Sequence, residues 1–488
     1  MDPTEILSLD NTSHADLWQR LGEIIEEYRS RLPAERAAPV ADPATVRALL
    51  SPLDFSQPLD PHAALDFAAK NLWEWQVHTP HPRYFGLFNP APTDMSIAAD
   101  ALAAAFNPQL ASWNHSPFAV EVEQHLVRAF AARFGYPEAS VDGTFCSGGA
   151  EANHTALLAA LVHTFPGFAR QGLRSLDGQP ALYVSTQSHH SFIKAARACG
   201  LGSDAVRSIP VNSALRMDVG DLAEQIKRDR EAGFAPFFVA ATAGTTNAGV
   251  IDPLPRLADM AARQGLWFHV DAAWGGAAAL VPELRPLLTG IERSDSITFD
   301  AHKWLSVSMG AGMFLTRHPE ILSQAFRITT EYMPRPGGED TIDPYTHSIQ
   351  WSRRFIGLKV FLSLLVAGWD GYAAVIRHQT EMGDLLRRQL EGDGWEIVNQ
   401  TRLPVVCFTE SRIPPERQAA YLESIAQEVV SSGVAWISTT RLDHGQPVLR
   451  ACITNYKTGP QDVRALVGAL ENARGKIHAG GEKGLVSS

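Results

Sequence analysis

The sequence predicts an α/β protein built on a mostly parallel sheet, with an N-terminal helical segment and a small C-terminal α+β region. Between about residues 86 and 375, short apolar runs alternate with helical patterns, which is typical of parallel strands joined by helices. After about residue 375, several short strand patterns precede a final helix. We therefore expect an N-terminal segment 1–85, a large domain 86–375 and a small domain 376–488.

Composition indicates the class of protein and the class of partner. The 488 residues are 45% hydrophobic and 19% charged, a balance that predicts a globular chain and excludes the disordered, collagen and coiled-coil classes. The net charge of −11 predicts no general attraction to nucleic acid or anionic lipid. A small molecule is therefore the expected partner.

Further observations predict a cytoplasmic protein without a metal. The four cysteines lie far apart without CxxC spacing, which favours neither a disulfide framework nor a cysteine zinc site. The stretch Met1–Glu5 is acidic and does not resemble a signal peptide. The most apolar long stretch, Phe355–Trp369, is too short to span a membrane and contains Lys359. The chain has no HExxH motif, so no metal site is expected.

The N-terminal segment predicts helices that need another body to pack against. Apolar residues recur at helical spacing between Leu17 and Tyr28, behind Ser13 as the predicted N-cap, with Asp16 in the capping-box position. Six prolines between residues 33 and 61 then divide the chain into short helices. Because such an arm does not form a core of its own, it favours an oligomer.

The large domain contains four predicted strands whose ends carry polar or glycine-rich residues. The strands are Ala181–Val184, Phe237–Ala241, Leu266–Val270 and Ser296–Phe299, and helical patterns accompany them at Glu151–Phe165 and Leu254–Gln264. Ligands bind beyond the carboxyl ends of parallel strands. We therefore expect the residues that follow these strands to meet at one site.

Two of these strand ends carry the strongest chemical signals. Asp271 ends the third strand and is directed at the expected crevice, with the capping of a helix as its alternative role. Lys303 follows the fourth strand beside His302. A lysine in a crevice can form a Schiff base because desolvation favours its neutral amine, whereas a lysine seen alone is more often solvated.

Three further segments complete a ligand site. Ser147–Asn153 opens a helix with two glycines, whose free N–H groups attract phosphate, and it lacks both nucleotide-loop patterns. Ser185–Ser191 places an imidazole where it can stack on a flat ring, although a lone histidine is more often structural, and Thr242–Asn247 supplies small hydroxyl residues. A phosphate cradle, a carboxylate, a stacking ring and a lysine together are what pyridoxal 5'-phosphate requires.

Periodicity predicts the elements at the end of the chain. Helices are expected at Phe355–Gly368, Ala373–Leu390 and Gln461–Ala473, and strands at Trp395–Val398, Val405–Phe408, Ala435–Ser438 and Leu449–Ile453. The first two helices would connect the large domain to the small one.

At these residues the sequence resembles the group II pyridoxal-phosphate-dependent amino acid decarboxylases, which include the aromatic amino acid, glutamate, tyrosine and diaminobutyrate decarboxylases. The resemblance extends from about residue 81 to about residue 457 and rests on His302-Lys303-Trp304, Asp271-Ala272-Ala273, Ala243-Gly244-Thr245-Thr246 and Gln187-Ser188-His189. It implies a fold-type-I pyridoxal phosphate enzyme that acts as a homodimer. It also implies the conversion of an L-amino acid to its amine and carbon dioxide.

The resemblance implies a role for each candidate residue. Lys303 would form the Schiff base with the cofactor, Asp271 would keep the ring nitrogen protonated, and His189 would stack on the ring. The phosphate would be held by Gly149, Ala150, Asp300 and His302, and the ring would be lined by Thr246 and Ala273. The substrate wall, which holds the carboxylate perpendicular to the ring, would be formed by Phe85, Phe88 and Asn89.

The proton donor to the α-carbon is expected in the loop before Arg353. Members of the family often carry a tyrosine there, and counting back from Arg353 places its position on Pro344, one residue before Tyr345. Tyr345 is therefore the expected donor, with Tyr332 and His347 as alternatives.

Three other functions are compatible with parts of the pattern. In an aldehyde-forming enzyme, oxygen would react at the α-carbon in place of the proton. An aminotransferase would need a late arginine for the substrate carboxylate, and Arg450 is the candidate. A non-catalytic scaffold is disfavoured because Lys303 and Asp271 are both intact.

Overall fold

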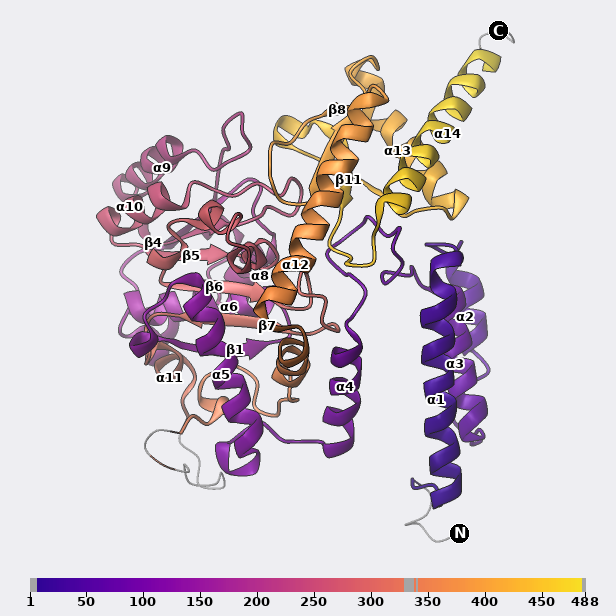
Figure 1. Ribbon diagram of the computed structural model, residues 1–488. Coiled ribbons are helices and arrows are strands. Elements are labelled where there is room, and N and C mark those ends of the chain that lie inside the picture. The colour runs from indigo at the N-terminus through magenta and orange to yellow at the C-terminus, as the bar shows by residue number, and fades with distance from the viewer. Residues whose placement is uncertain (1–6, 329–337, 339–340, 485–488) are drawn as a thin grey trace.

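A seven-stranded sheet lies at the centre of the computed structural model, which describes residues 7–328, 338 and 341–484 (Figure 1). Its strands are β1 (Asp142–Cys146), β2 (Pro180–Ser185), β3 (Val206–Ile209), β4 (Ala235–Thr242), β5 (Trp267–Asp271), β6 (Ser296–Asp300) and β7 (Gly312–Thr316). Their order is β1-β7-β6-β5-β4-β2-β3, with β7 antiparallel to both neighbours and β6, β5, β4, β2 and β3 parallel. The predicted mostly parallel sheet is confirmed, and the four predicted strands are β2, β4, β5 and β6.

Helices cover both faces of this sheet. One face packs against α5 (Pro117–Phe134), α9 (Val219–Glu231) and α10 (Leu254–Gln264), and the other against α6 (Gly149–Thr164), α8 (Ser191–Ala198) and α11 (Ile321–Phe326). Along β2, Tyr183 faces the first set of helices, whereas Leu182 and Val184 face the second, as the two-residue period of a strand requires. The short α7 (Phe168–Gln171) follows α6.

A second, antiparallel sheet forms the smaller C-terminal body. Its strands are β8 (Glu396–Ile397), β9 (Val405–Thr409), β10 (Ser438–Arg441) and β11 (Pro447–Cys452), in the order β10-β11-β9-β8, and helices α13 (Pro415–Ser432) and α14 (Pro460–Gly484) pack on it. The strand expected at 435–438 begins only at Ser438. The backbone just before it is already engaged, because Trp436 pairs with Tyr84 and accepts a hydrogen bond from the N–H of Phe85.

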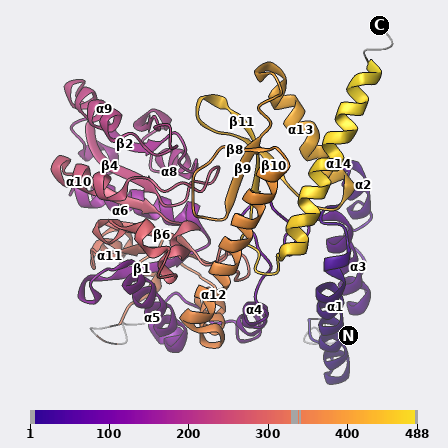
Figure 2. The ribbon, with the colours of Figure 1, turned by 45° about the horizontal axis from the view of Figure 1, so that its top comes forward.

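Helix α12 (Gly357–Gly392) connects the two bodies (Figures 1 and 2). It contains both helices expected from periodicity, which meet at Gly368, whose φ of 62° interrupts the helical geometry. Within the described part of the chain, α12 is the one helix long and apolar enough to cross a membrane by length and composition. It packs against α4 (Asp94–Phe106), α5 and α14, and its Lys359 is buried.

Three N-terminal helices stand as a separate layer beside these bodies (Figures 1 and 2). They are α1 (Asn11–Arg31), α2 (Pro43–Leu50) and α3 (Pro61–Trp75), and none of them contains a fully buried residue. Helix α1 starts earlier than expected, because Asp10 rather than Ser13 is its N-cap and accepts from the N–H groups of Thr12 and Ser13.

Candidate active site

The carboxyl ends of β4, β5 and β6 bring the predicted residues to one edge of the large sheet. Thr242 is paired with Asp271, and Asp271 is paired with Thr298 on the next strand. Asp300 ends that strand, and Lys303 lies in the turn that follows it. The residues therefore meet where the strand-end argument predicts a ligand site.

Lys303 forms an ion pair with Asp300. Its Nζ lies 2.9 Å from Asp300 Oδ2, and the lysine side chain is 25% exposed whereas the carboxylate is 1% exposed. Burial would lower the pKa of Lys303, but the charge and hydrogen bond of Asp300 and the charge of Asp271 outweigh it, so the pKa is raised above its ordinary value. The amine is therefore held as an ammonium group while nothing is attached to it.

Asp300 also organises the start of helix α6. Its Oδ2 accepts from the N–H of Gly149 at 3.0 Å and lies 3.9 Å from His302 Nε2, while its Oδ1 has no partner in the described chain. A Cβ on Gly149 would stand 2.9 Å from that carboxylate and 3.3 Å from Ala273. The site therefore requires glycine at 149, and the expected phosphate and ring residues lie side by side.

His302 is oriented by the backbone of its own loop. Its Nδ1 accepts from the N–H of Ala311 at 3.1 Å, and its ring lies close to Gly148. Burial lowers the pKa of His302, against the raising effect of the Asp300 charge. A neutral imidazole here leaves Nε2 as a hydrogen-bond donor beside the helix start.

Asp271 is held rigidly at the end of β5. It is 5% exposed, its Oδ1 accepts from the N–H of Ala273 at 3.1 Å, and its Oδ2 accepts from Asn153 Nδ2 at 2.8 Å. The sequence argument named Asn153 only as the last residue of a glycine-containing segment and gave it no role. Its position four residues after Gly149 places it on the face of α6 that meets the sheet.

His189 presents an exposed imidazole to the same site. Its Nδ1 accepts from the N–H of Ser191 at 3.2 Å. Burial lowers the pKa of His189. The charge of Asp271 acts in the opposite direction, and the charge of Lys303 lowers the pKa further. The charges of both groups therefore act on His189, whose expected role is to stack on the ring.

Arg450 joins the small domain to two loops of the large one. Its side chain is 2% exposed, Nε donates to the carbonyl of Thr246 at 2.9 Å, and Nη1 donates to the carbonyl of Gly86 at 2.7 Å. The guanidinium lies 5.0 Å from the ring of Phe88, which stacks on Trp274 at 4.4 Å. Nη2 is buried without a partner in the described chain.

The three expected substrate residues lie in different surroundings. Phe88 is buried beneath Arg450, and Asn89 donates to Met309 Sδ at 3.0 Å. Phe85 is 0% exposed and belongs to the apolar core of the small domain, between backbone bonds to Trp436 and Cys452. Its side chain therefore packs that core rather than a substrate wall.

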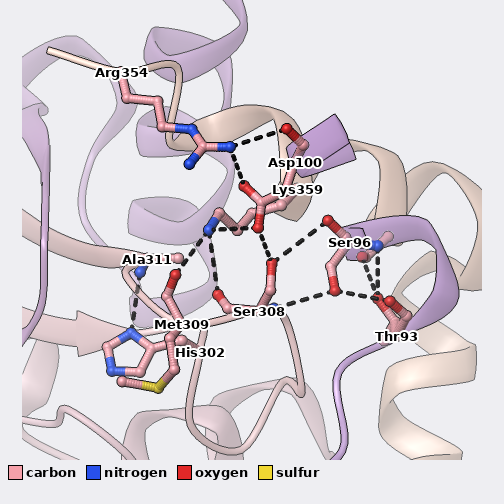
Figure 3. A network of polar contacts seen from close by, with 10 residues as sticks. Thr93, Ser96, Asp100, His302, Ser308, Met309, Ala311, Arg354 and Lys359 are labelled. Atoms are coloured by element: carbon pink, nitrogen blue, oxygen red, sulfur yellow. Dashed lines mark hydrogen bonds and ion pairs between the residues drawn. The ribbon is translucent and has the colours of Figure 1, made fainter. Parts of the chain in front are cut away.

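A second polar cluster holds the loop 304–311, which follows Lys303 (Figure 3). Lys359 Nζ donates to the carbonyls of Met309 at 2.8 Å and Ser308 at 3.4 Å, and lies 3.2 Å from Asp100 Oδ2. Ser308 Oγ donates to the same carboxylate. The cluster thus anchors the loop to α4 and α12.

The expected proton donor lies in a separate group of contacts. The N–H of Tyr345 donates to the carbonyl of Ala111 at 3.1 Å, and its ring lies 4.9 Å from that of Trp351. His347 Nε2 lies 3.5 Å from Asp142 Oδ2. Within the residues described, neither side chain contacts Lys303, and Tyr332 lies outside the described residues.

The site fits pyridoxal 5'-phosphate by its donors and its space. Lys303 provides the amine, Asp271 an oriented carboxylate, and His189 an exposed ring. Only glycine fits at 149 and 312, since a Cβ on Gly312 would lie 2.7 Å from both Asp300 Oδ1 and Gly148 Cα. The first amides of α6 lie beside this space, and helix starts attract phosphate.

Comparisons with known proteins agree with this geometry. The family model described as the pyridoxal-dependent decarboxylase conserved domain matches residues 43–411. The chain is 31% identical to an aromatic-L-amino-acid decarboxylase of Bacillus atrophaeus, over 94% of this chain and 95% of that protein. It is 32% identical to a tyrosine decarboxylase of Oryza sativa subsp. japonica, over 83% of this chain and 78% of that protein.

Solved structures have the same fold. The crystal structure of mouse CSAD in its apo form matches with a TM-score of 0.89 and 28% identity, covering 95% of this chain and 99% of that chain. The structure of Oryza sativa TDC with PLP and tryptamine matches with a TM-score of 0.90 and 25% identity, covering 97% and 99% of the two chains. The likeness therefore extends over nearly the whole length of the chain.

Proposed function

This chain belongs to the pyridoxal-dependent decarboxylase family, and on that premise we propose how its own residues support its activity. It is a pyridoxal-phosphate-dependent enzyme that decarboxylates an L-amino acid. The cofactor supplies a carbonyl that exchanges between amines and a protonated ring that accepts the electron pair left when carbon dioxide departs. The ion pair of Lys303 with Asp300, one strand away from Asp271, is the observation that carries the proposal.

Lys303 provides the amine that holds the cofactor, and Asp300 governs the proton on that amine. A nucleophilic amine must be neutral. Asp300 Oδ2 lies 2.9 Å from Nζ and stabilises the ammonium form, so this contact sets how readily Nζ gives up its proton. Gly149 and His302 both contact Asp300, and together with Ala150 they would hold the phosphate.

Asp271 would receive a charge-assisted hydrogen bond from the ring nitrogen. Its two oxygens are already fixed by Ala273 and Asn153, so the carboxylate cannot rotate away. His189 and Ala273 would lie against the ring, and Thr246 would line its edge. Phe88 and Trp274 are both buried and stack on each other, and they would help to exclude water from the site.

We assign the substrate carboxylate to Nη2 of Arg450. The other two guanidinium nitrogens are engaged by Thr246 and Gly86, and a buried cationic donor without a partner is costly unless a ligand satisfies it. Arg450→Gln should raise KM for the L-amino acid about tenfold or more, with a smaller effect on cofactor affinity. An unchanged KM would contradict the assignment.

Exposed apolar side chains support the proposal that the enzyme is a homodimer. Trp18 and Ile25 on α1 are 46% and 40% exposed, and Phe106 and Phe118 are 81% and 67% exposed beside an apolar groove of about 410 Å³. Patches of this kind mark interfaces. Sedimentation should give twice the 53.2 kDa mass, and Phe106→Asp with Phe118→Asp should give the monomer.

We also place the enzyme in the cytoplasm, which its four unpaired cysteines support. Cell fractionation followed by immunoblotting tests this location. Recovery in a membrane or secreted fraction would contradict it.

Product analysis tests the reaction itself. Protein loaded with pyridoxal 5'-phosphate is incubated with aromatic, acidic, sulfinate and diamino L-amino acids, and amine, aldehyde and keto acid are measured together by mass spectrometry. An amine in equal amount to carbon dioxide is expected from one substrate, and Lys303→Ala should produce none. Aldehyde or keto acid as the main product would replace decarboxylation to an amine by the oxidative or the transaminating reaction.

A further inference from the structure

One buried amide side chain connects Asp271 to His189. Asn153 Nδ2 donates one hydrogen to Asp271 Oδ2 at 2.8 Å and the other to Ser191 Oγ at 2.9 Å. The N–H of Ser191 donates in turn to His189 Nδ1 at 3.2 Å. Asn153 therefore braces both the carboxylate expected at the ring nitrogen and the imidazole expected on the ring face.

A polar chain continues behind Asn153 into the sheet. Asn153 Oδ1 lies 3.1 Å from His269 Nε2 and accepts from Thr298 Oγ1 at 2.7 Å. His269 Nδ1 lies 2.8 Å from Ser296 Oγ, which accepts from Trp267 Nε1 at 2.8 Å. All five side chains are 3% exposed or less. Each polar atom of Asn153 and His269 thus has a partner within the protein.

The donors and acceptors in this chain fit in one direction only. Trp267 Nε1 can only donate, so Ser296 Oγ accepts from it and has its own proton available for His269 Nδ1. The proton of His269 is then on Nε2, which donates to Asn153 Oδ1. In the other tautomer, the lone pair of His269 Nε2 would face the lone pairs of Asn153 Oδ1, which is unfavourable. Rotating the Asn153 amide by half a turn would relieve this contact but would place Oδ1 against the Asp271 carboxylate.

His269 serves this chain as a neutral donor. Phe192 and Phe238 lie 5.9 Å and 5.8 Å from its ring, and burial lowers the pKa of His269 to about 3. It therefore carries no charge at neutral pH. Its single N–H on Nε2 is committed to Asn153, which leaves the amide hydrogens of Asn153 directed at Asp271 and Ser191.

We propose that Asn153 is a positioning residue of the decarboxylase, oriented by His269, that fixes the orientation of the Asp271 carboxylate and sets His189 in place. The inference rests on the proposed function, because it concerns how these residues meet the cofactor. Asn153 acts through its two neighbours and need not touch the cofactor itself.

Asn153→Leu is the first variant, because it keeps the size of the side chain and removes both amide hydrogens. The dissociation constant for pyridoxal 5'-phosphate should rise about tenfold or more, since hydrogen bonds to charged groups are strong. The value of kcat/KM should fall with it, because Asp271 loses the hydrogen bond that orients its carboxylate. The pH titration of the bound cofactor's absorbance should shift as well.

A pair of substitutions at His269 tests the direction of the chain. His269→Gln can place an amide nitrogen near the position of Nε2 and donate to Asn153, whereas His269→Asn is too short to reach it. The first should bind the cofactor with close to the wild-type dissociation constant, and the second should follow Asn153→Leu. This pair keeps the proposal testable even if Asn153→Leu does not fold.

Two serines provide a matched control. Ser294 and Ser296 are both 0% exposed, but Ser294 bonds to Tyr136 at 2.8 Å, outside the chain. Ser296→Ala should shift the absorbance titration and Ser294→Ala should not, although both should lower Tm. If Asn153→Leu lowers Tm but leaves the cofactor dissociation constant and the titration unchanged, Asn153 is only structural and the proposal is overturned. If wild-type protein shows no Lys303-dependent cofactor absorbance, the proposed function fails instead.

Discussion

Lys303 and Asp300 are joined by an ion pair, with Nζ 2.9 Å from Oδ2, in the turn directly after β6. The same oxygen accepts from the N–H of Gly149, so the carboxylate connects the amine to the start of α6. An amine stabilised as an ammonium group in this way cannot react until it loses a proton. Its partner therefore controls how readily the free enzyme takes up its cofactor.

Asp300→Asn should change the pH dependence of cofactor uptake. Asp300 raises the pKa of Lys303 against the effect of burial, so its removal should lower that pKa and raise the neutral fraction of the amine at a given pH. The rate at which apoprotein gains cofactor absorbance should therefore peak at lower pH. An unchanged profile would show that Asp300 does not govern the proton.

Arg353→Met should destabilise the large domain strongly. Arg353 Nη2 lies 2.6 Å from Glu123 Oε2, and both side chains are 3% exposed. Removing one partner of a buried pair leaves the other charge without compensation, which costs about 3–5 kcal/mol. Urea unfolding should show this loss, and the double variant with Glu123→Leu should recover part of it. Equal stability of the single and double variants would contradict the pairing argument.

Asp142→Asn should make the free energy of unfolding less dependent on pH between pH 5 and pH 8. Burial raises the pKa of Asp142 to about 7, above its unfolded value, so the folded protein binds the extra proton between about pH 4 and pH 7. The free energy of unfolding of the wild type should fall by about 2 kcal/mol as pH rises from 5 to 8 through this group. The variant should lack this fall, since its amide still accepts from the N–H of Gly143.

His347 provides the check on that interpretation. Its Nε2 lies 3.5 Å from Asp142 Oδ2, and burial lowers the pKa of His347 to about 4. Because this pKa lies below the unfolded value, His347 lowers the free energy of unfolding only as pH falls from about 6.5 toward 4. The two groups therefore act in opposite directions along the pH scale. If wild type and Asp142→Asn give parallel urea midpoints from pH 5 to pH 8, the raised pKa of Asp142 is refuted.

Lys359→Met should loosen the loop 304–311 without unfolding the protein. Lys359 donates to two carbonyls of this loop, and Lys359→Arg is the matched control because it keeps the charge beside Asp100. Hydrogen exchange in peptides covering Ser308 and Met309 should rise for the methionine variant at unchanged Tm. Exchange rates equal to those of wild type would show that other contacts hold the loop.

Local pattern predicted the central part of the fold well. Each of the strands β2, β4, β5 and β6 is a short apolar run buried on both faces, and a strand of this kind is recognisable without tertiary information. Because parallel strands end at one edge, Asp271 and Lys303 could be assigned to a common site from the sequence. The sequence did not show that Phe85 belongs to the C-terminal core and not to the site, since its burial depends on residues more than 300 positions away.

The residues behind the site were missed for a different reason. His269 and Asp271 alternate along β5, and Ser296 and Thr298 alternate along β6 opposite them. Polar residues at every second position of two otherwise apolar strands were therefore a usable signal for a buried hydrogen-bonded chain. The start of α1 depends on which of two residues caps the helix, and the start of β10 depends on the backbone partners of Trp436. Hydrophobic periodicity carries no information on either.

The insertion of residues 83–86 into the C-terminal core has a consequence for how the chain is made. Phe85 is translated early, whereas its neighbour Phe408 emerges on the order of 20 to 60 s later at ribosomal speeds of about 5–20 residues per second. During that interval Phe85 lacks its partners in the C-terminal core, and its apolar surface is open to chaperones or to aggregation. The C-terminal core of this enzyme can therefore form around Phe85 only late in synthesis, after its C-terminal strands have emerged from the ribosome.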